Sequence, residues 1–241
     1  MSVAALKALE RERMTRDAHW FLFDSGACVT RDEHDFEHPV KPIPDLPYLR
    51  AVLDLLLVSG GLLDPTRAVH ALVAGGTGPY LRYLAQARVL FVEKSRQMLV
   101  SWMVCAYLLW RGKAKAHQLI LVQSKKEEDA ANLVYAGQDM VNARMSFIES
   151  RLPRHLQSIT HKAYAHLYDQ NGTHWWGIPE GGSIIRSNVP SVLFSDEAAF
   201  QPEFGKAYTA ALPAVKGGGQ LIAVSSAEVG DFCDLIEGLA A

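Results

Sequence analysis

Residues 88–111, RVLFVEKSRQMLVSWMVCAYLLWR, decide how the rest of the chain can fold. Residues 89–92 are an apolar run typical of a buried strand, residues 93–100 are polar to mixed, and residues 101–110 are apolar nearly all round. A helix that is apolar on every side is one that lies buried, here against a sheet. The stretch therefore predicts a strand, a loop and a buried helix, which is the layout of a phosphate-binding loop.

The usual signature of such a loop, GxxxxGK[ST], does not match this stretch. Lys94 and Leu99 stand where the two glycines would be, and Val100 stands where the lysine would be. Ser101 alone keeps its place, which is that of a Mg²⁺ ligand. By this signature alone, a strand, a turn and a core helix would be the better interpretation, so the rest of the chain has to decide.

Composition restricts the class of protein. The 241 residues are 49% hydrophobic and 21% charged with a net charge of −2, so any contact with nucleic acid must be local. The three cysteines, Cys28, Cys105 and Cys233, lie far apart, which argues against a zinc site or a disulfide framework. No apolar run is long enough to span a membrane and the N-terminus does not resemble a signal peptide, so we expect a cytoplasmic protein that makes no membrane contact.

The part before the central stretch is predicted to be mostly helical with one irregular arm. The expected segments are a charged helix over residues 1–18, a Pro-rich loop or extended arm over 19–48, an amphipathic helix over 48–58, a second helix over 64–74 and a glycine-rich turn over 75–79. Within the arm, His34 and His38 match the zinc-enzyme pattern HxxEH. Pro39 disfavours the helix that this pattern needs, so an acidic loop in solvent is the better interpretation.

The part after the central stretch alternates strands with helices. The expected segments are a strand over 118–123, a capping box at Ser124 that opens a helix to about Asn142, a strand over 191–195, a helix over 198–211 and a strand over 220–224. Short apolar strands separated by helices predict an α/β fold with a mostly parallel sheet and helices on both faces. Ligands bind such sheets at the carboxyl ends of the strands.

Three of the predicted strands end in polar residues that suit a nucleoside triphosphate. Asp196 could hold Mg²⁺ and the adjacent Glu197 could polarise an attacking water. Lys94 could reach the β- and γ-phosphates from the start of the loop, with Arg96 as a second, forked donor. Cations at the start of a helix oppose its dipole unless an anion is bound, which favours a phosphate site over plain surface charge.

Three motifs in this order resemble those of the ATPase half of phage terminase large subunits, the DNA-packaging motors of tailed phages and prophages. They are KSRQMLVSW (94–102), VLFSDEAAF (192–200) and AVSSAE (223–228). WFLFD (20–24), KPIPDLPYL (41–49) and QSKKEEDA (123–130) are similar to the version found in Mu-like prophages. In that family the first motif is a deviant Walker A whose lysine has moved to the start of the loop. The resemblance therefore implies a P-loop NTPase fold of the RecA-like type.

The resemblance also implies roles for particular residues. Asp196 and Ser101 would bind Mg²⁺, Glu197 would activate water with Lys94 and Arg96 as catalytic cations, and the serine pair would couple loss of the γ-phosphate to DNA movement. The residues that it assigns to ATP are Lys94, Ser95, Arg96, Gln97, Met98, Ser101, Ser225 and Ser226. It places the adenine pocket upstream of the loop, so residues 1–48 are expected to contribute it and residues 49–241 to form the ATPase core.

The family's partners and its larger architecture complete the expectation. The resemblance implies a homo-oligomeric ring that works on double-stranded DNA with a portal protein and a small terminase subunit. A neighbouring subunit's arginine often completes the site of such a ring, and the candidates are Arg144, Arg151, Arg154 and Arg186. Family members carry a C-terminal RNase H-like nuclease domain, and the chain stops just after the third motif, so no nuclease activity is expected.

Two alternatives remain at this point. A helicase-like ATPase would share the second and third motifs but would normally carry its lysine at position 100. A non-catalytic nucleotide-binding or assembly module from a decayed prophage gene would explain the altered loop, although it would not need the water-activating carboxylate of Glu197.

Overall fold

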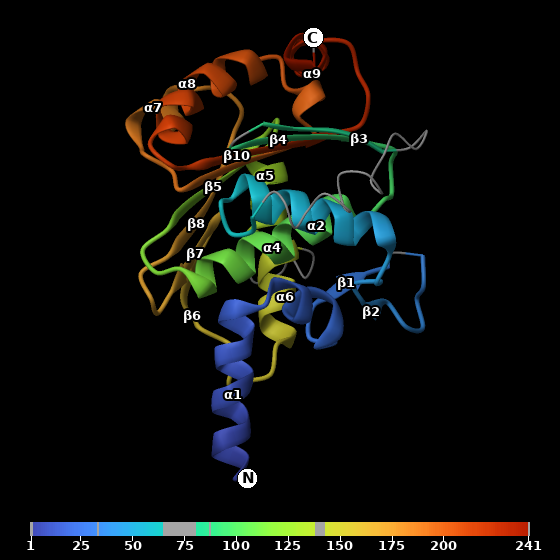
Figure 1. The fold of residues 1–241 in the computed structure, drawn as a ribbon, viewed down its shortest axis with the longest axis vertical. Helices are drawn as coiled ribbons and strands as arrows, with labels where there is room; N and C mark the ends of the chain where they lie inside the picture. The colour runs from blue at the N-terminus through green and yellow to red at the C-terminus, as the bar shows by residue number, and fades with distance from the viewer. Residues whose placement is uncertain (1, 33, 65–80, 87, 138–142, 241) are drawn as a thin grey trace.

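The computed structural model describes the chain except for residues 1, 33, 65–80, 87, 138–142 and 241. Across the described residues an eight-stranded sheet runs in the order β3-β4-β10-β9-β5-β8-β7-β6 (Figure 1). The strands are β3 (Leu81–Gln86), β4 (Val89–Lys94), β5 (Leu119–Gln123), β6 (Ile159–Ala163), β7 (His166–Asp169), β8 (His174–Ile178), β9 (Val192–Asp196) and β10 (Gln220–Ser225). The five central strands β4, β10, β9, β5 and β8 are parallel, while β3 pairs antiparallel with β4, β7 pairs antiparallel with β8, and β6 pairs antiparallel with β7. The predicted α/β class with a mostly parallel sheet is confirmed.

Helices cover both faces of this sheet, as predicted (Figure 1). They are α1 (Val3–Arg16), α2 (Pro47–Ser59), α4 (Val100–Ala114), α5 (Glu127–Leu133) and α6 (Arg144–Arg151) on one side, and α7 (Ser183–Ser187), α8 (Phe204–Lys216) and α9 (Asp231–Ala240) on the other. Side chains of a strand point alternately to its two faces. In β4, Leu90 and Val92 therefore join the core under α4, while Val89 and Phe91 join the core under α8.

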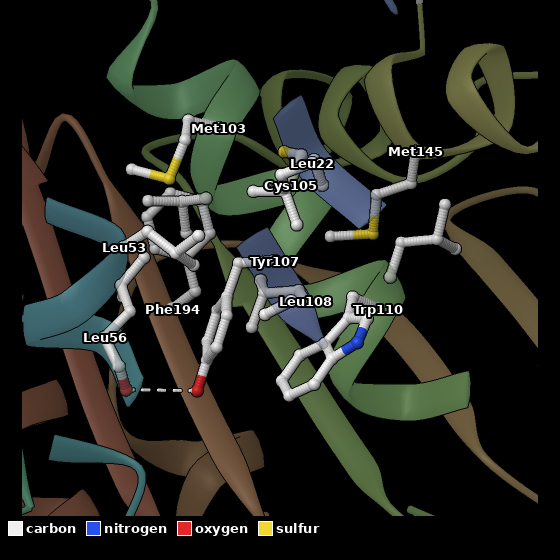
Figure 2. Packing of buried hydrophobic residues seen from close by; sticks show 14 of the residues in the cluster. Leu22, Leu53, Leu56, Met103, Cys105, Tyr107, Leu108, Trp110, Met145 and Phe194 are labelled. Atoms are coloured by element: carbon white, nitrogen blue, oxygen red, sulfur yellow. Dashed lines mark hydrogen bonds between the residues drawn. The ribbon is translucent and has the colours of Figure 1, made fainter. Parts of the chain in front are cut away.

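Helix α4 is the centre of the larger core. Figure 2 shows side chains of α2, α6 and β9, together with Leu22, gathered around it. Tyr107 is fully buried and its hydroxyl donates to the Leu56 carbonyl at 3.2 Å, and the Trp175 indole N–H donates to the Leu108 carbonyl at 3.0 Å. Because these polar atoms have partners, large aromatic side chains can be buried here at little cost. The helix, and the loop that precedes it, are thereby fixed on the sheet.

The N-terminal part agrees with the sequence in its helices and adds detail in the arm. The charged helix (α1) and the amphipathic helix (α2) are confirmed. The arm contains a π-helix, η1 (Trp20–Asp24), and a two-stranded hairpin of β1 (Val29–Arg31) and β2 (Val40–Pro42). His34 and His38 lie in its loop, where backbone N–H groups donate to Asp32 and Asp35, so the HxxEH pattern is not helical.

The predicted helix over 64–74 and the glycine-rich turn over 75–79 fall almost entirely outside the described residues. Among the helices that the structure describes, none is long and apolar enough to cross a membrane.

The helix predicted from Ser124 to about Asn142 is wrong at both ends. The Ser124 N–H donates to the Ile178 carbonyl at 3.2 Å, so this residue still belongs to the pairing between β5 and β8. Helix α5 begins after Lys126, which makes no side-chain capping hydrogen bond, and it ends at Leu133. The Ser-x-x-Glu pattern was therefore not a capping box, because sheet pairing takes the serine's backbone away from the helix.

The helix predicted over 198–211 is interrupted. A short 3-10 turn, η3 (Ala198–Phe200), is followed by extended Gln201 and only then by α8. Gln201 precedes Pro202, and the residue before a proline is pushed out of the helical region by the proline ring. The break lets the Gln201 amide donate to the Asp196 carbonyl at 2.8 Å and to the Ser195 hydroxyl at 3.0 Å.

Replacement of Gly112 by alanine should destabilise the fold, because an added Cβ would overlap the Trp175 ring and lie 2.8 Å from Cγ2 of Thr173. Alanine gains about 1 kcal/mol over glycine inside a helix, yet overpacking of this kind costs about 1–3 kcal/mol. We expect a net loss of free energy of unfolding, measured by urea denaturation. Gly217→Ala is the matched control, since its Cβ would make only an ordinary contact at 3.4 Å. Equal stability of the two variants would contradict the packing described.

Candidate functional site

The site is built by the pairing register of three neighbouring strands. In the parallel ladder, Ser225 of β10 lies opposite Glu93 of β4, and Val224 lies opposite Asp196 of β9. Lys94, the last residue of β4, therefore lies at about the same level as Ser226 and Glu197, the residues that follow β10 and β9. The three polar strand ends that the sequence singles out are brought together at one edge.

Lys94 and Glu197 form the central contact of this edge. The ammonium Nζ lies 2.8 Å from Glu197 Oε1, and the lysine side chain is only 7% exposed while that of the glutamate is 39% exposed. Ser226 donates to Glu197 Oε2 from its hydroxyl at 3.1 Å and from its backbone N–H at 3.3 Å. The carboxylate is thus held from two sides, with one face open to solvent.

Ser225 and Ser226 play different structural parts. Ser225 is fully buried; its hydroxyl oxygen lies 3.5 Å from Glu197 Oε2 and accepts the Ala199 N–H at 3.1 Å. Ser226 lines the cleft described below. Ser225 therefore connects the turn after β9 to β10, and Ser226 can contact a ligand in the cleft.

Asp196 lies beside Ser101, at the start of α4. The Ser101 hydroxyl donates to Asp196 Oδ1 at 2.7 Å, and Arg144 Nη1 lies 3.4 Å from Oδ2. A hydroxyl and a carboxylate are ligands that Mg²⁺ accepts, and this ion usually keeps several waters and binds substrate phosphates as well. The described residues hold no group of three or more His, Cys, Asp or Glu that could bind a metal alone. The donor set fits Mg²⁺ that is shared with a phosphate ligand.

The loop between β4 and α4 has an unusual backbone. Gln97 has φ 62° and Leu99 has φ 56°, both in the left-handed region that favours glycine. Leu99 stands at the position of the second glycine of the standard signature, so the backbone keeps the glycine-like conformation without the glycine. Such strain persists only where surrounding contacts hold it. One of these contacts is the Tyr48 hydroxyl, which donates to the Met98 carbonyl at 3.2 Å.

A cleft of about 1150 Å³ opens over this loop. Its lining includes the loop residues Arg96, Gln97 and Met98, as well as Lys94, Ser101, Asp196 and Glu197. The hairpin of the arm supplies the other wall through Thr30, Arg31, Asp32, His34, Lys41 and Pro42. Six Lys and Arg residues line the cleft against four Asp and Glu, so it favours an anionic ligand. Among the residues predicted for the site, Ser95 is half-buried and does not line the cleft.

The two acids of the site have opposite pKa shifts. Burial raises the pKa of Asp196, and the charge of Arg144 with the Ser101 hydrogen bond offsets this only in part. Burial also opposes ionisation of Glu197, but the hydrogen bond and charge of Lys94, together with the hydrogen bonds from Ser226, outweigh it, so the pKa of Glu197 is lowered. Glu197 is therefore kept ionised, as a group that accepts a proton from water must be.

The four candidate arginines differ in whether they line the cleft. Arg144 lies in the chain's own cleft, against Asp196. Arg151 lies over the Phe147 ring, and Arg154 and Arg186 are exposed and do not line the cleft. The sequence does not place Arg144 beside Asp196, because no motif surrounds it and its position depends on how α6 packs against α4.

Comparison with solved structures shows what this fold resembles. The crystal structure of the HK97 bacteriophage large terminase has a TM-score of 0.50 and 17% sequence identity, over 74% of this chain and 36% of that chain. The chain shares the fold of this large terminase. It spans about a third of the HK97 protein's length. More distant matches are the ATPase domain of the Thermus phage P74-26 large terminase (TM-score 0.42, 15% identity, 57% of this chain and 59% of that one) and the ADP complex of a large terminase from another thermophilic bacteriophage (0.42, 15%, 55% and 32%). No protein-family model and no curated protein sequence matches the chain.

The opposite pKa shifts predict opposite effects of neutral replacements on stability. The pKa of Glu197 is lower in the folded state than in the unfolded state. Glu197 therefore adds to the free energy of unfolding above the unfolded pKa, and this added stability is lost as the pH falls through the folded pKa. The pKa of Asp196 is higher in the folded state than in the unfolded state. The stability that its protonated form allows is therefore fully present below the unfolded pKa and is lost as the pH rises through the folded pKa. At pH 7, Glu197→Gln should lower the free energy of unfolding and Asp196→Asn should raise it.

Urea denaturation at neutral and acidic pH checks this. Each difference from the wild type should shrink as the pH falls through the lower of the folded and unfolded pKa values of that carboxyl group, because the group is then protonated in both states. Glu197→Gln with the stability of the wild type at pH 7 would show that Lys94 does not hold this carboxylate in solution.

Proposed function

We propose that the chain is the ATP-hydrolysing domain of a phage or prophage terminase large subunit, which powers the translocation of double-stranded DNA into procapsids. The observation that carries the proposal is the meeting of Lys94, Ser101, Asp196 and Glu197 in one positively charged cleft, at the carboxyl edge of a parallel sheet. Such an edge is where sheets of this class bind ligands. A fold shared with the HK97 large terminase supports the same interpretation.

The residues of the cleft divide the work of hydrolysis. Lys94 would bind the β- and γ-phosphate oxygens with help from Arg96, while the loop from Ser95 to Met98 would surround the phosphates. Ser101 and Asp196 would hold Mg²⁺, which supplies positive charge to the phosphates when it is bound. Glu197 would orient and deprotonate the attacking water. Ser226 would respond to a movement of the Glu197 carboxylate through the two hydrogen bonds that it donates to Oε2, and the buried Ser225 would support it.

The Lys94–Glu197 ion pair would make the activation of water depend on the prior binding of phosphate. Without phosphate, the lysine neutralises the carboxylate at 2.8 Å. A triphosphate carries more negative charge than one carboxylate, so it would draw the ammonium towards itself. Glu197 would then lose its main partner, and its affinity for a proton would rise at the moment when a water has to be activated.

The arm would contribute the adenine pocket. The hairpin of β1 and β2 forms the cleft wall that faces the phosphate loop, and Tyr48 links the end of the arm to that loop. We therefore propose residues 1–48 as the part that contacts the base, and residues 49–241 as the ATPase core. The resemblance to the Mu-like type, which rests on residues 20–24, 41–49 and 123–130, stays a prediction.

The wider function rests on the resemblance. The domain would act in the host cytoplasm as one subunit of a homo-oligomeric ring, with double-stranded DNA, a portal protein and a small terminase subunit as partners. Arg151, Arg154 and Arg186 are the arginines left to act on a neighbour's site, because Arg144 is engaged within its own chain. A helicase-like ATPase is disfavoured since Val100, at the position of its lysine, is buried at 1% exposure.

Glu197→Gln should separate binding from hydrolysis. The variant should bind ATP about as tightly as the wild type, because glutamine keeps the size of the side chain, yet its single-turnover rate should fall by about 100-fold or more. The measurement is hydrolysis of radiolabelled ATP over a range of protein concentrations, since ring assembly should raise the wild-type rate. ATP binding by the wild type without hydrolysis at any concentration would favour a non-catalytic module.

Lys94→Ala should abolish nucleotide binding, whereas Val100→Ala should leave it nearly unchanged. The lysine would supply the cation nearest the phosphates, while Val100 would lose only buried apolar contacts. Titration with a fluorescent ATP analogue measures both, with Lys206→Ala as a control that removes an exposed lysine paired to Glu203. A larger loss in Val100→Ala than in Lys94→Ala would show that the phosphate loop has been placed in the wrong register.

A further inference from the structure

Arg144 occupies an unexpected place beside the carboxylate of Asp196. It is the first residue of α6, a helix that packs against α4. Its Nη1 lies 3.4 Å from Asp196 Oδ2, and the Ser101 hydroxyl takes the other oxygen at 2.7 Å. Both carboxylate oxygens of the proposed metal ligand therefore already have a partner within the chain.

Neighbouring aromatic side chains hold the guanidinium in this place. It lies over the Trp102 ring at 5.7 Å from the ring centre, and Trp102 meets Phe147 of α6 edge to face at 5.6 Å. A cation over an indole ring is attracted by the ring's negative face. The side chains of Arg144 and Asp196 are 30% and 9% exposed, so the carboxylate is buried and its partner reaches it from the cleft.

The geometry of the pair indicates a contact that can be exchanged. A strong arginine–carboxylate pair is bidentate with shorter distances, whereas Arg144 makes one long contact to one oxygen. A guanidinium and a divalent cation also repel each other strongly at such short range. Asp196 therefore cannot hold Mg²⁺ on Oδ2 while Arg144 stays in place.

We propose that Arg144 is an internal competitor of the metal ion for Asp196. It keeps the affinity for divalent cations low in the nucleotide-free chain, and it is displaced when metal and nucleotide arrive together. This rests on the proposed function for the nucleotide. Arg144 lines the same cleft as Lys94 and Arg96, so phosphate oxygens are available to the displaced guanidinium as a new partner. Metal and nucleotide binding are then coupled through one side chain.

Mn²⁺ is a suitable probe, because it takes the same oxygen ligands and its free form gives an electron paramagnetic resonance signal. The chain is titrated with Mn²⁺ in the absence of nucleotide, as the wild type, Arg144→Met and Arg144→Lys. Methionine keeps much of the length of the arginine side chain but removes the charge, and lysine keeps the charge. Arg11→Met is the matched control, since it removes an exposed arginine of α1 that does not line the cleft.

We expect Arg144→Met to bind Mn²⁺ at least tenfold more tightly than the wild type, and Arg144→Lys and Arg11→Met to resemble the wild type. If Arg144→Met bound Mn²⁺ no better than the wild type, the proposal would be overturned and the ion pair would be only a structural contact. Arg144→Gln is measured beside it, so that a folding defect in the methionine variant, seen by circular dichroism, does not decide the result. The gain should vanish in Arg144→Met/Asp196→Asn, and its persistence there would also refute the competition.

Nucleotide binding is measured on the same samples with a fluorescent ADP analogue. Wild-type chain that fails to bind it would count against the proposed ATPase, whatever the Mn²⁺ result. Normal nucleotide binding combined with unchanged Mn²⁺ affinity in Arg144→Met would count against Arg144 alone. The two proposals therefore fail in different ways.

Discussion

The pairing of β10 between β4 and β9 is the constraint on which the rest of the structure depends. Because parallel strands share one register, Lys94, Ser226 and Glu197 lie at about one level at the edge of the sheet. A slip by one residue would turn every side chain to the opposite face and would separate Lys94 from Glu197. The strands that keep this register are apolar on both faces, with cores under α4 and under α8. Burial of these two cores therefore does more than stabilise the chain, since it also aligns the charges of the site.

The electrostatics of the site follow from this alignment. Two adjacent acids, Asp196 and Glu197, lie in one strand end, and each has its own cation from a different element. Lys94 comes from the strand two places along the sheet, and Arg144 comes from a helix that lies on α4. Buried charges without partners would be costly, so the ion pairs are what allow two acids to sit side by side at the base of the cleft. The same pairs are the contacts that an anion or a divalent cation would have to exchange.

The sequence predicts the fold well where apolar periodicity is strong, and the site where residues follow strand ends. The strands β4, β5, β9 and β10 and the helix α4 are recognised from apolar runs alone, and parallel topology then brings Lys94, Asp196 and Ser226 to one edge. Local patterns were less reliable. The Ser124 pattern resembles a capping box, but sheet pairing takes up its backbone, and Pro202 breaks a helix that composition favours. Arg144 is absent from the prediction of the chain's own site because its place depends on how two helices pack, which no short motif encodes.

The loop between β4 and α4 holds Gln97 and Leu99 in a left-handed backbone conformation without any glycine. A glycine-rich loop reaches such shapes easily but also leaves them easily, because glycine has many accessible conformations. Side chains at these positions remove most of those alternatives, and the Tyr48 contact on Met98 holds the shape that remains. The ordering entropy of the loop is then lost when the chain folds instead of when a ligand arrives. In a loop of this kind the side chains hinder close approach of a phosphate to the backbone, but the loop is already rigid before a ligand binds.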